Sequence, residues 1–198
     1  MRYDADSGLE IPIWHDTVQE RLRLLAEFGL DGIPDAEFDG FAAHVSGTFA
    51  SELGAAGQGL YAMVNLFMRE EQTFIGLHNP PGARAVARTM APDHGFCPEM
   101  LDRTKALVLA DVCAKPQFAS NPVVDKLGVR TYAGAPLVHE GTGTVLGSVC
   151  VVGASPLPKA TRQTSLVLIK RHRDALVELL GQRTRRRGGR HGTGYQDG

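Results

Sequence analysis

An apolar residue every three or four positions between residues 17 and 28 predicts a helix with one buried face. Thr17 and Glu20 are spaced as a capping box, in which each side chain accepts a hydrogen bond from a backbone N–H at the helix start. Arg21 and the other charged residues of this segment are expected on the surface. A second stripe with helical spacing, from Phe38 to Phe49, follows an aspartate that can cap it and predicts a second helix.

The pattern changes to short apolar runs after a glycine-rich break at residues 54–59. These runs are bounded by turn residues, so they predict strands rather than helices. The expected strands cover residues 60–68, 72–77, 106–110, 132–139 and 144–152. The last two flank Glu-Gly-Thr-Gly, which is a hairpin signature. Strands joined by tight turns pair antiparallel, and together with the helices they predict an α+β fold.

The remaining segments carry weaker patterns. Residues 78–94 show no period and are expected to form a loop, whereas Phe96 to Thr104 are expected to form a short helix. Residues 115–129 are expected to form a long loop with one helical turn. A last helix is predicted over residues 161–180, with a glycine as its stop, and its apolar residues step by three and four like the seam of a paired helix.

The chain of 198 residues suits one domain with terminal extensions. Apolar residues make up 43% of the chain and charged residues 22%, which is ordinary for a globular protein with a full core. The expected division is an irregular N-terminus at residues 1–14, a domain at residues 15–160, a C-terminal helix at residues 161–181 and a basic, disordered tail at residues 182–198.

The composition predicts a cytoplasmic protein with reduced thiols and no membrane association. The apolar runs are far shorter than the ~18–20 residues that a membrane span needs, and the N-terminus lacks the apolar core of a signal peptide. The three cysteines, Cys97, Cys113 and Cys150, are too few and too scattered for a disulfide framework. Cys150 lies in an apolar strand and is assigned to the core, and the same buried role is the first interpretation of Cys97.

The net charge of −1 conceals an uneven distribution. Residues 170–198 contain eight basic and three acidic residues, whereas residues 1–169 contain 13 basic and 19 acidic residues. An arginine-rich tail could hold a nucleic acid or an acidic lipid surface by displacing counterions. Tyr195 is the only aromatic residue of the tail, so base stacking would be weak and a solvated tail is the better interpretation.

Signatures of most enzyme and metal sites are missing from the sequence. The seven histidines show neither H-x-x-x-H nor H-x-E spacing, and no C-x-x-C is present. The glycine patterns of phosphate loops, dinucleotide-binding folds and serine hydrolases are absent as well. No catalytic residue or metal site is therefore predicted, and the sequence leaves any cofactor unknown.

The most informative part of the sequence is an ordered set of short motifs between Phe96 and Val152. In chain order they are Phe-Cys at 96–97, Leu-Val-x-x-Asp at 107–111, Phe-x-x-Asn-Pro-Val at 118–123, Arg-x-Tyr-Ala-Gly-x-Pro-Leu at 130–137 and Leu-Gly-x-x-Cys-Val at 146–151. With Pro-Asp-x-x-Phe-Asp at 34–39, they resemble the GAF family of small-molecule sensor domains over about residues 33–156. Pro98 and Glu99 depart from that pattern, because relatives follow Phe-Cys with a small residue and a histidine.

The resemblance implies a central antiparallel sheet with helices packed on one face and a loop-roofed ligand pocket on the other. It places the ligand between the sheet and the loop at residues 111–130. The pocket residues implied in this way are Phe96, Cys97, Asp111, Phe118, Asn121, Arg130 and Tyr132. The polar members of this set can instead fasten the loop to the sheet, and the aromatic members can be core residues.

The leading hypothesis is a stand-alone, non-catalytic bacterial sensor whose ligand the sequence does not identify. Closing the loop would shift the helices at residues 17–28 and 161–180, which are expected to pair two copies and to signal to a partner protein. The second hypothesis is a thiol enzyme similar to free methionine-R-sulfoxide reductase, because Cys97 falls near one of its cysteines, although Ser120 stands at another. The third hypothesis is docking of a protein or nucleic acid through the tail.

Overall fold

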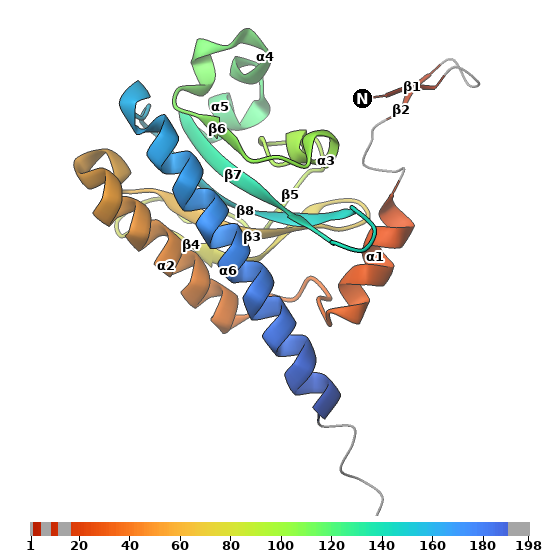
Figure 1. Cartoon of the computed structure of the whole chain (residues 1–198). Helices are drawn as coiled ribbons and strands as arrows, with labels where there is room; N and C mark the ends of the chain where they lie inside the picture. The colour runs from red at the N-terminus through yellow and green to blue at the C-terminus, as the bar shows by residue number, and fades with distance from the viewer. Residues whose placement is uncertain (1, 5–8, 12–16, 190–198) are drawn as a thin grey trace, which may run out of the picture.

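A six-stranded antiparallel sheet with the strand order β5-β4-β3-β8-β7-β6 carries the other elements (Figure 1). The computed structural model describes residues 2–4, 9–11 and 17–189. The strands are β3 (Tyr61–Phe67), β4 (Gln72–His78), β5 (Thr89–Met90), β6 (Leu107–Leu109), β7 (Thr131–Val138) and β8 (Val145–Gly153). The helices are α1 (Val18–Glu27), α2 (Ala36–Leu53), α3 (Glu99–Arg103), α4 (Pro116–Ala119), α5 (Pro122–Leu127) and α6 (Arg162–Gly189). The predicted α+β class and antiparallel sheet are confirmed.

Alternating side chains give the sheet two apolar faces, because successive strand residues point to opposite sides. In β3, Val64 and Leu66 belong to a core beneath the helices, whereas Met63 and Phe67 belong to a second core on the other side. The second core also contains apolar side chains from the segment between residues 96 and 129. The central strands are therefore buried on both faces, as the apolar run at residues 60–68 predicted.

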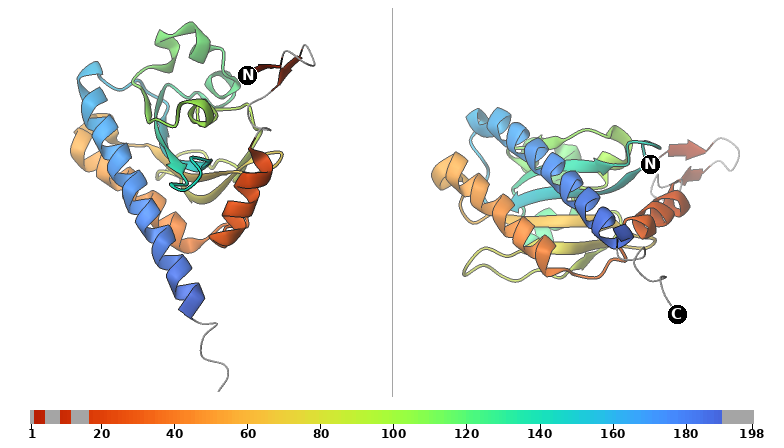
Figure 2. Two further views of the ribbon diagram at one scale, coloured as in Figure 1. Left: turned by 45° about the vertical axis from the view of Figure 1, so that its right-hand side comes forward. Right: turned by 60° about the horizontal axis from the view of Figure 1, so that its bottom comes forward.

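The helices α2 and α6 cover one face of the sheet together (Figure 2). The start of α2 approaches β4 so closely that a Cβ atom on Gly76 would overlap the backbone carbonyl of Phe38. This glycine allows the helix backbone to rest on the strand, as a close approach requires. The opposite face is covered by α3, α4, α5 and the segments between them, which belong to the second core.

The polar residues of α1 differ from their prediction. Thr17 makes no capping bond, and its hydroxyl instead accepts a hydrogen bond from Arg21 at 2.8 Å. Arg21 is buried rather than exposed, and its Nε donates to the carbonyl oxygen of Val145 at 2.8 Å. Burial lowers the pKa of Arg21 to about 10, so the side chain stays charged at neutral pH. Helical spacing alone could not show that β8 begins beside this position.

The last helix is longer than predicted, because α6 continues through Gly181 to Gly189. Arg183 forms ion pairs with Asp35 at 2.6 Å and Glu37 at 2.8 Å, and its guanidinium lies 4.7 Å from the centroid of the Phe38 ring. These contacts join the end of α6, beyond the glycine at which the helix was expected to stop, to the start of α2. The hydrogen bond from Arg183 also lowers the pKa of Asp35. The disordered tail predicted from residue 182 is therefore wrong up to residue 189, and residues 190–198 lie outside the described residues.

The apolar side chains of α6 that were expected to pair with a second copy are mainly buried inside the molecule. Ile169, Leu176 and Leu180 are buried in the core beneath the helices. A dimer built on these side chains would have to remove them from the sheet. Val167 and Val177 are large apolar residues of α6 that are exposed.

Two further segments are more regular than predicted. Residues 2–4 and 9–11, expected to be irregular, form the antiparallel strands β1 (Arg2–Asp4) and β2 (Leu9–Ile11). The loop expected at residues 78–94 contains β5, which pairs with the start of β4. Strands of two or three residues are too short to show a recognisable alternation of apolar and polar residues. No helix within the described ranges is long and apolar enough to cross a membrane.

A buried histidine lies between α2 and α6. His172 is only 3% exposed, its ring stacks on Phe49 with a centroid separation of 6.5 Å, and Phe41 and His44 contact its edges. Its Nε2 has no hydrogen-bond partner within the described part of the chain. Burial, helped by the charges of His44 and Arg171, lowers the pKa of His172 from 6.5 to about 4.

The protein should therefore lose stability as the pH falls from about 6.5 towards 4, because the unfolded chain binds a proton that folded His172 does not. Above pH 6.5 this contribution is fully present. We expect His172→Phe to flatten that part of the pH profile, measured by urea unfolding at several pH values. His94→Gln, in the segment before α3, is the control and should keep the wild-type slope. Equal slopes for wild type and His172→Phe would contradict the prediction.

Candidate functional site

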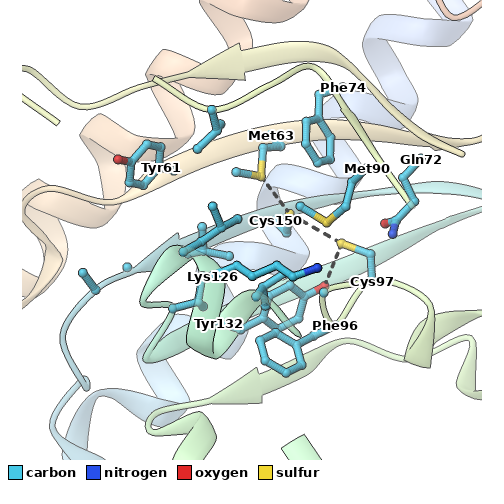
Figure 3. Close-up of a pocket in the computed structure, with 18 of the residues that line it drawn as sticks. Tyr61, Met63, Gln72, Phe74, Met90, Phe96, Cys97, Lys126, Tyr132 and Cys150 are labelled. Atoms are coloured by element: carbon cyan, nitrogen blue, oxygen red, sulfur yellow. Dashed lines mark hydrogen bonds between the residues drawn. The ribbon is translucent and has the colours of Figure 1, made fainter. Parts of the chain in front are cut away.

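A cavity of about 170 Å³ lies between the second face of the sheet and the segments that cover it (Figure 3). Its floor is formed by alternate residues of β3, β4, β7 and β8, and its walls by residues 84–97 and by α5. The lining side chains are mainly apolar or sulfur-containing: Tyr61, Met63, Phe74, Val86, Met90, Phe96, Cys97, Val123, Leu127, Val129, Tyr132, Cys150 and Val152. Such a surface suits a small, largely apolar guest.

Charged groups are confined to the rim of this cavity. Arg84 and Lys126 both line it, and both residues are exposed. Figure 3 shows the Lys126 side chain extended across the opening in front of Tyr132. Within the described residues no acidic side chain lines the cavity. The rim is therefore positively charged and the interior is nearly neutral.

Tyr132 reaches the centre of the site because the next residue on its side of β7 is Gly134. The tyrosine ring folds along the strand over that glycine, and a Cβ atom there would overlap the phenol oxygen. Phe96 packs against the ring at 5.4 Å between centroids. The tyrosine hydroxyl then donates to the sulfur of Cys97 at 3.3 Å. Gly134 is thus required for close approach rather than for backbone flexibility.

Cys97 lies at one end of a row of three sulfur atoms. Its Sγ lies 3.7 Å from Sγ of Cys150, which in turn lies 3.8 Å from Sδ of Met63 (Figure 3). Hydrogen bonding from Cys150, Ser148, Tyr132 and Asn65 outweighs burial and lowers the pKa of the Cys97 thiol to about 7. The same pairing and burial raise the pKa of Cys150 well above its usual value. Of the two thiols, Cys97 is the one that loses its proton first.

A buried polar group on the floor ties one wall to the sheet. The side-chain amide of Asn65 donates to Gln72 Oε1 at 2.9 Å, and Gln72 Nε2 donates to the carbonyl oxygens of Ala91 at 2.9 Å and His94 at 2.7 Å. Ser148 is the cross-strand partner of Asn65. The hydroxyl of Ser148 is buried and forms no hydrogen bond to nitrogen or oxygen within the described ranges, which leaves it free to donate to the nearby Cys97 sulfur.

Three of the seven residues predicted for the pocket, Phe96, Cys97 and Tyr132, line the cavity. Phe118 is buried behind Phe96, with their rings edge to face at 5.9 Å. It fills the core instead of facing the cavity because α4 carries it to the outer side of Phe96.

The three polar residues of the predicted set fasten the covering segment. Asp111 pairs with Arg130 at 3.1 Å and accepts a hydrogen bond from the N–H of Cys113. Asn121 bonds both the N–H and the carbonyl oxygen of Gly95 and also caps α5. None of the three lines this cavity, and their contacts match the alternative role given for them, which is to fasten the loop to the sheet. Loops need side-chain partners for backbone groups that a sheet would have paired.

The sequence reasoning missed Cys150, Met63, Phe74 and Lys126 as cavity residues. A signal for the first two existed, because the residues that alternate with the helix-facing positions of β3 and β8 share the other face. The contact between Cys97 and Cys150 joins positions 53 residues apart, and spacing along the chain could not show it. No three His, Cys, Asp or Glu side chains come together as a metal site in the parts of the chain that are described.

A family model described as GAF domain matches residues 44–182. The free methionine-R-sulfoxide reductase of Neisseria meningitidis, solved with its substrate, is 14% identical with a TM-score of 0.51, covering 94% of this chain and 95% of its own. A protein described as a GAF sensor from Burkholderia vietnamiensis is 19% identical with a TM-score of 0.51, covering 87% and 96%.

A third similar structure is the PixJ GAF domain of Thermosynechococcus elongatus in its blue-light-absorbing form. It is 12% identical with a TM-score of 0.52, covering 79% of this chain and 94% of its own. At these identities the likeness shows the fold alone. No curated protein matches the chain in sequence.

The contact between Tyr132 and Cys97 gives a direct prediction. Tyr132→Phe removes the hydroxyl that donates to the sulfur, and should raise the pKa of Cys97 by about one to two units, because a hydrogen bond to a charged acceptor contributes about 1.5–3 kcal/mol. The pH dependence of Cys97 alkylation by iodoacetamide measures the change. Tyr61→Phe is the matched control, since its hydroxyl donates to the carbonyl oxygen of Arg84. Equal profiles for both variants would contradict the assignment.

Proposed function

The chain belongs to the GAF domain family, and on that premise we propose that it is a non-catalytic sensor that binds a small molecule in the cavity beneath α5. The observation that carries this proposal is a partly open, mainly apolar cavity of about 170 Å³ between the sheet and the segments that cover it. Close packing is the rule in protein interiors, so an apolar space of this size beside the second core suits a guest molecule.

The size of the cavity limits the guest. An engineered apolar cavity of about 150 Å³ accommodates benzene. The present cavity of about 170 Å³ therefore suits one six-membered ring with a small substituent, held between side chains such as Phe96 and Met63. Larger cofactors would require the walls to move apart.

The rim of the cavity favours an anionic substituent. Arg84 and Lys126 are the basic residues that line it, whereas the interior contains neutral polar groups and the thiol of Cys97, whose pKa is about 7. A carboxylate at the opening would pair with these cations, while the ring replaces water inside. The proposed ligand class is a monocyclic carboxylate.

A structural change in the cavity would reach α6 through a short stretch of the chain. Gly153 and Ala154, at the end of β8, line the cavity, and the chain then runs through a short connection into that helix. Movement of this strand end on binding would shift the start of α6. Val167 and Val177 of that helix, 52% and 40% exposed, offer a contact for a second copy or a signalling partner.

We expect benzoate to raise the melting temperature of the protein more than its neutral counterpart benzamide does, because only benzoate pairs with the rim. A ligand at 100 times its Kd stabilises by about 2.7 kcal/mol, which shifts Tm by several degrees. Lys126→Met should reduce the advantage of benzoate, because only Arg84 then remains at the rim, and should leave benzamide unaffected. Lys105→Met, another exposed lysine, should behave like wild type.

A cavity-filling variant makes this test decisive. Val152→Trp should abolish binding of both compounds, because Val152 lines the space they would occupy. Binding that survives in Val152→Trp would place the compounds elsewhere. Absence of any shift with one-ring carboxylates in wild type would remove this ligand class from the proposal.

One observation favours a second candidate, a thiol reductase acting on a small sulfoxide. It is the short distance of 3.7 Å between Cys97 and Cys150 in the cavity wall. A structurally similar protein from Neisseria meningitidis is a free methionine-R-sulfoxide reductase. Against this candidate, Ser120 is exposed at the end of α4 and does not line the cavity, so it contributes nothing to the thiol pair.

The sensor and the reductase are distinguished by whether the protein reduces free methionine-R-sulfoxide. With free methionine-R-sulfoxide and dithiothreitol, we expect wild type to reduce no more substrate than Cys97→Ser, because nothing in the cavity is placed to accept the amino acid's charged groups apart from the rim cations. The amount of methionine formed, measured by chromatography, decides the question. If wild type forms methionine and Cys97→Ser does not, the protein is a reductase rather than a non-catalytic sensor.

A further inference from the structure

Two free thiols meet in the wall of the cavity. Cys97 belongs to the segment that precedes α3, and Cys150 to the central strand β8. Their side chains are 6% and 1% exposed, and both line the cavity. A sulfur separation of 3.7 Å means that a disulfide of about 2.05 Å requires a shift of under 2 Å, which the non-helical segment before α3 can supply more readily than the strand.

The surroundings make the two thiols unequal. Tyr132 donates its hydroxyl to Cys97 at 3.3 Å, and the buried hydroxyl of Ser148 is the cross-strand neighbour of Asn65 on the same floor. The hydrogen bond with Cys150 and these two donors stabilise a thiolate on Cys97, which is why its pKa falls to about 7. Cys150 instead contacts the thioether of Met63, which offers no proton to stabilise charge. Cys97 is therefore the thiol that reacts first as a nucleophile, and Cys150 is the thiol that then reacts with Cys97.

We propose that Cys97 is a modification site at which an apolar organic hydroperoxide is reduced, and that Cys150 then closes a reversible disulfide with it. The cavity gives the route to these buried sulfurs, and its apolar lining selects the oxidant. A one-ring hydroperoxide fits the same space of about 170 Å³ that the proposed ligand would occupy.

The chemistry balances with the two thiols and one hydroperoxide. The Cys97 thiolate attacks the terminal oxygen of the hydroperoxide, so an S–O bond forms, the O–O bond breaks and the alcohol leaves after taking a proton. Cys150 then loses its proton and attacks the sulfur of the sulfenic acid, and the S–O bond breaks to release water. Two thiols are oxidised to one disulfide, and the hydroperoxide is reduced to an alcohol. An external dithiol restores the starting state by exchange.

The disulfide would also change the cavity. It joins the wall before α3 directly to the floor strand β8, and it draws Cys97 towards Cys150. This narrows the cavity at its centre, between Phe96 and Met63. This consequence rests on the proposed function, because it predicts that the oxidised protein binds a one-ring carboxylate less well. The disulfide itself does not depend on that proposal.

The test uses the full chain, one equivalent of cumene hydroperoxide and intact-protein mass spectrometry. Wild type should lose about 2 Da and regain it with dithiothreitol, and unfolded protein should show one remaining thiol of the three. Cys150→Ser should stop at a gain of about 16 Da that dimedone captures. Cys97→Ser should react at least tenfold more slowly. Cys113→Ser, which removes the exposed thiol, is the matched control and should behave like wild type.

Additional measurements keep each outcome informative. Cys97→Ala and Cys150→Ala repeat the test without a hydroxyl, and thermal unfolding confirms that each variant is folded. Peptide mapping should find the bond between Cys97 and Cys150. Hydrogen peroxide, which gains nothing from an apolar cavity, should oxidise wild type more slowly than cumene hydroperoxide does.

The proposal is overturned by unchanged thiols in excess hydroperoxide, by a bond that involves Cys113, or by equal rates in wild type and Cys97→Ser. Benzoate binding separates this proposal from the sensor. A disulfide in a protein that never binds benzoate leaves the thiol site standing, whereas benzoate binding with inert thiols supports the sensor alone.

Discussion

The central strands of the sheet must bury side chains on both faces, and the rest of the structure follows from this requirement. The face beneath α2 and α6 is filled by two long helices whose apolar sides interlock with residues such as Val64 and Leu66. Among the described residues, no long helix covers the other face. It is closed by short helices and irregular segments, and an irregular cover leaves space where a helix would not.

An irregular cover needs polar anchors, because its backbone groups lack the regular partners of a helix or sheet. Gln72, Asn121 and the pair of Asp111 with Arg130 supply them. Each anchor binds backbone at the edge of the cavity or holds the ends of the covering segment together. The cavity therefore persists without collapse, and the residues that hold it open are largely distinct from the residues that face it.

Within the cavity, the chemistry is that of sulfur in apolar surroundings. Tyr132, Cys97, Cys150 and Met63 form a continuous row of contacts across the floor, and the hydroxyl of Tyr132 reaches it only because Gly134 has no side chain. Charge is kept at the rim, on Arg84 and Lys126. An apolar interior with a basic rim and a reactive sulfur is consistent both with reversible binding and with a thiol that responds to an oxidant.

The sequence by itself determined the two-faced sheet, its hairpin and the helices before and after it, because local periodicity and turn residues set these elements. Its motifs also pointed to Phe96, Cys97 and Tyr132, which line the cavity. Only the tertiary structure decided which polar residues are anchors, that Arg21 is buried, that α6 continues past Gly181 to contact Asp35, and that Cys150 meets Cys97. Each of these outcomes depends on contacts between residues far apart in the chain. Periodicity reports which face a residue occupies, but not what lies opposite that face.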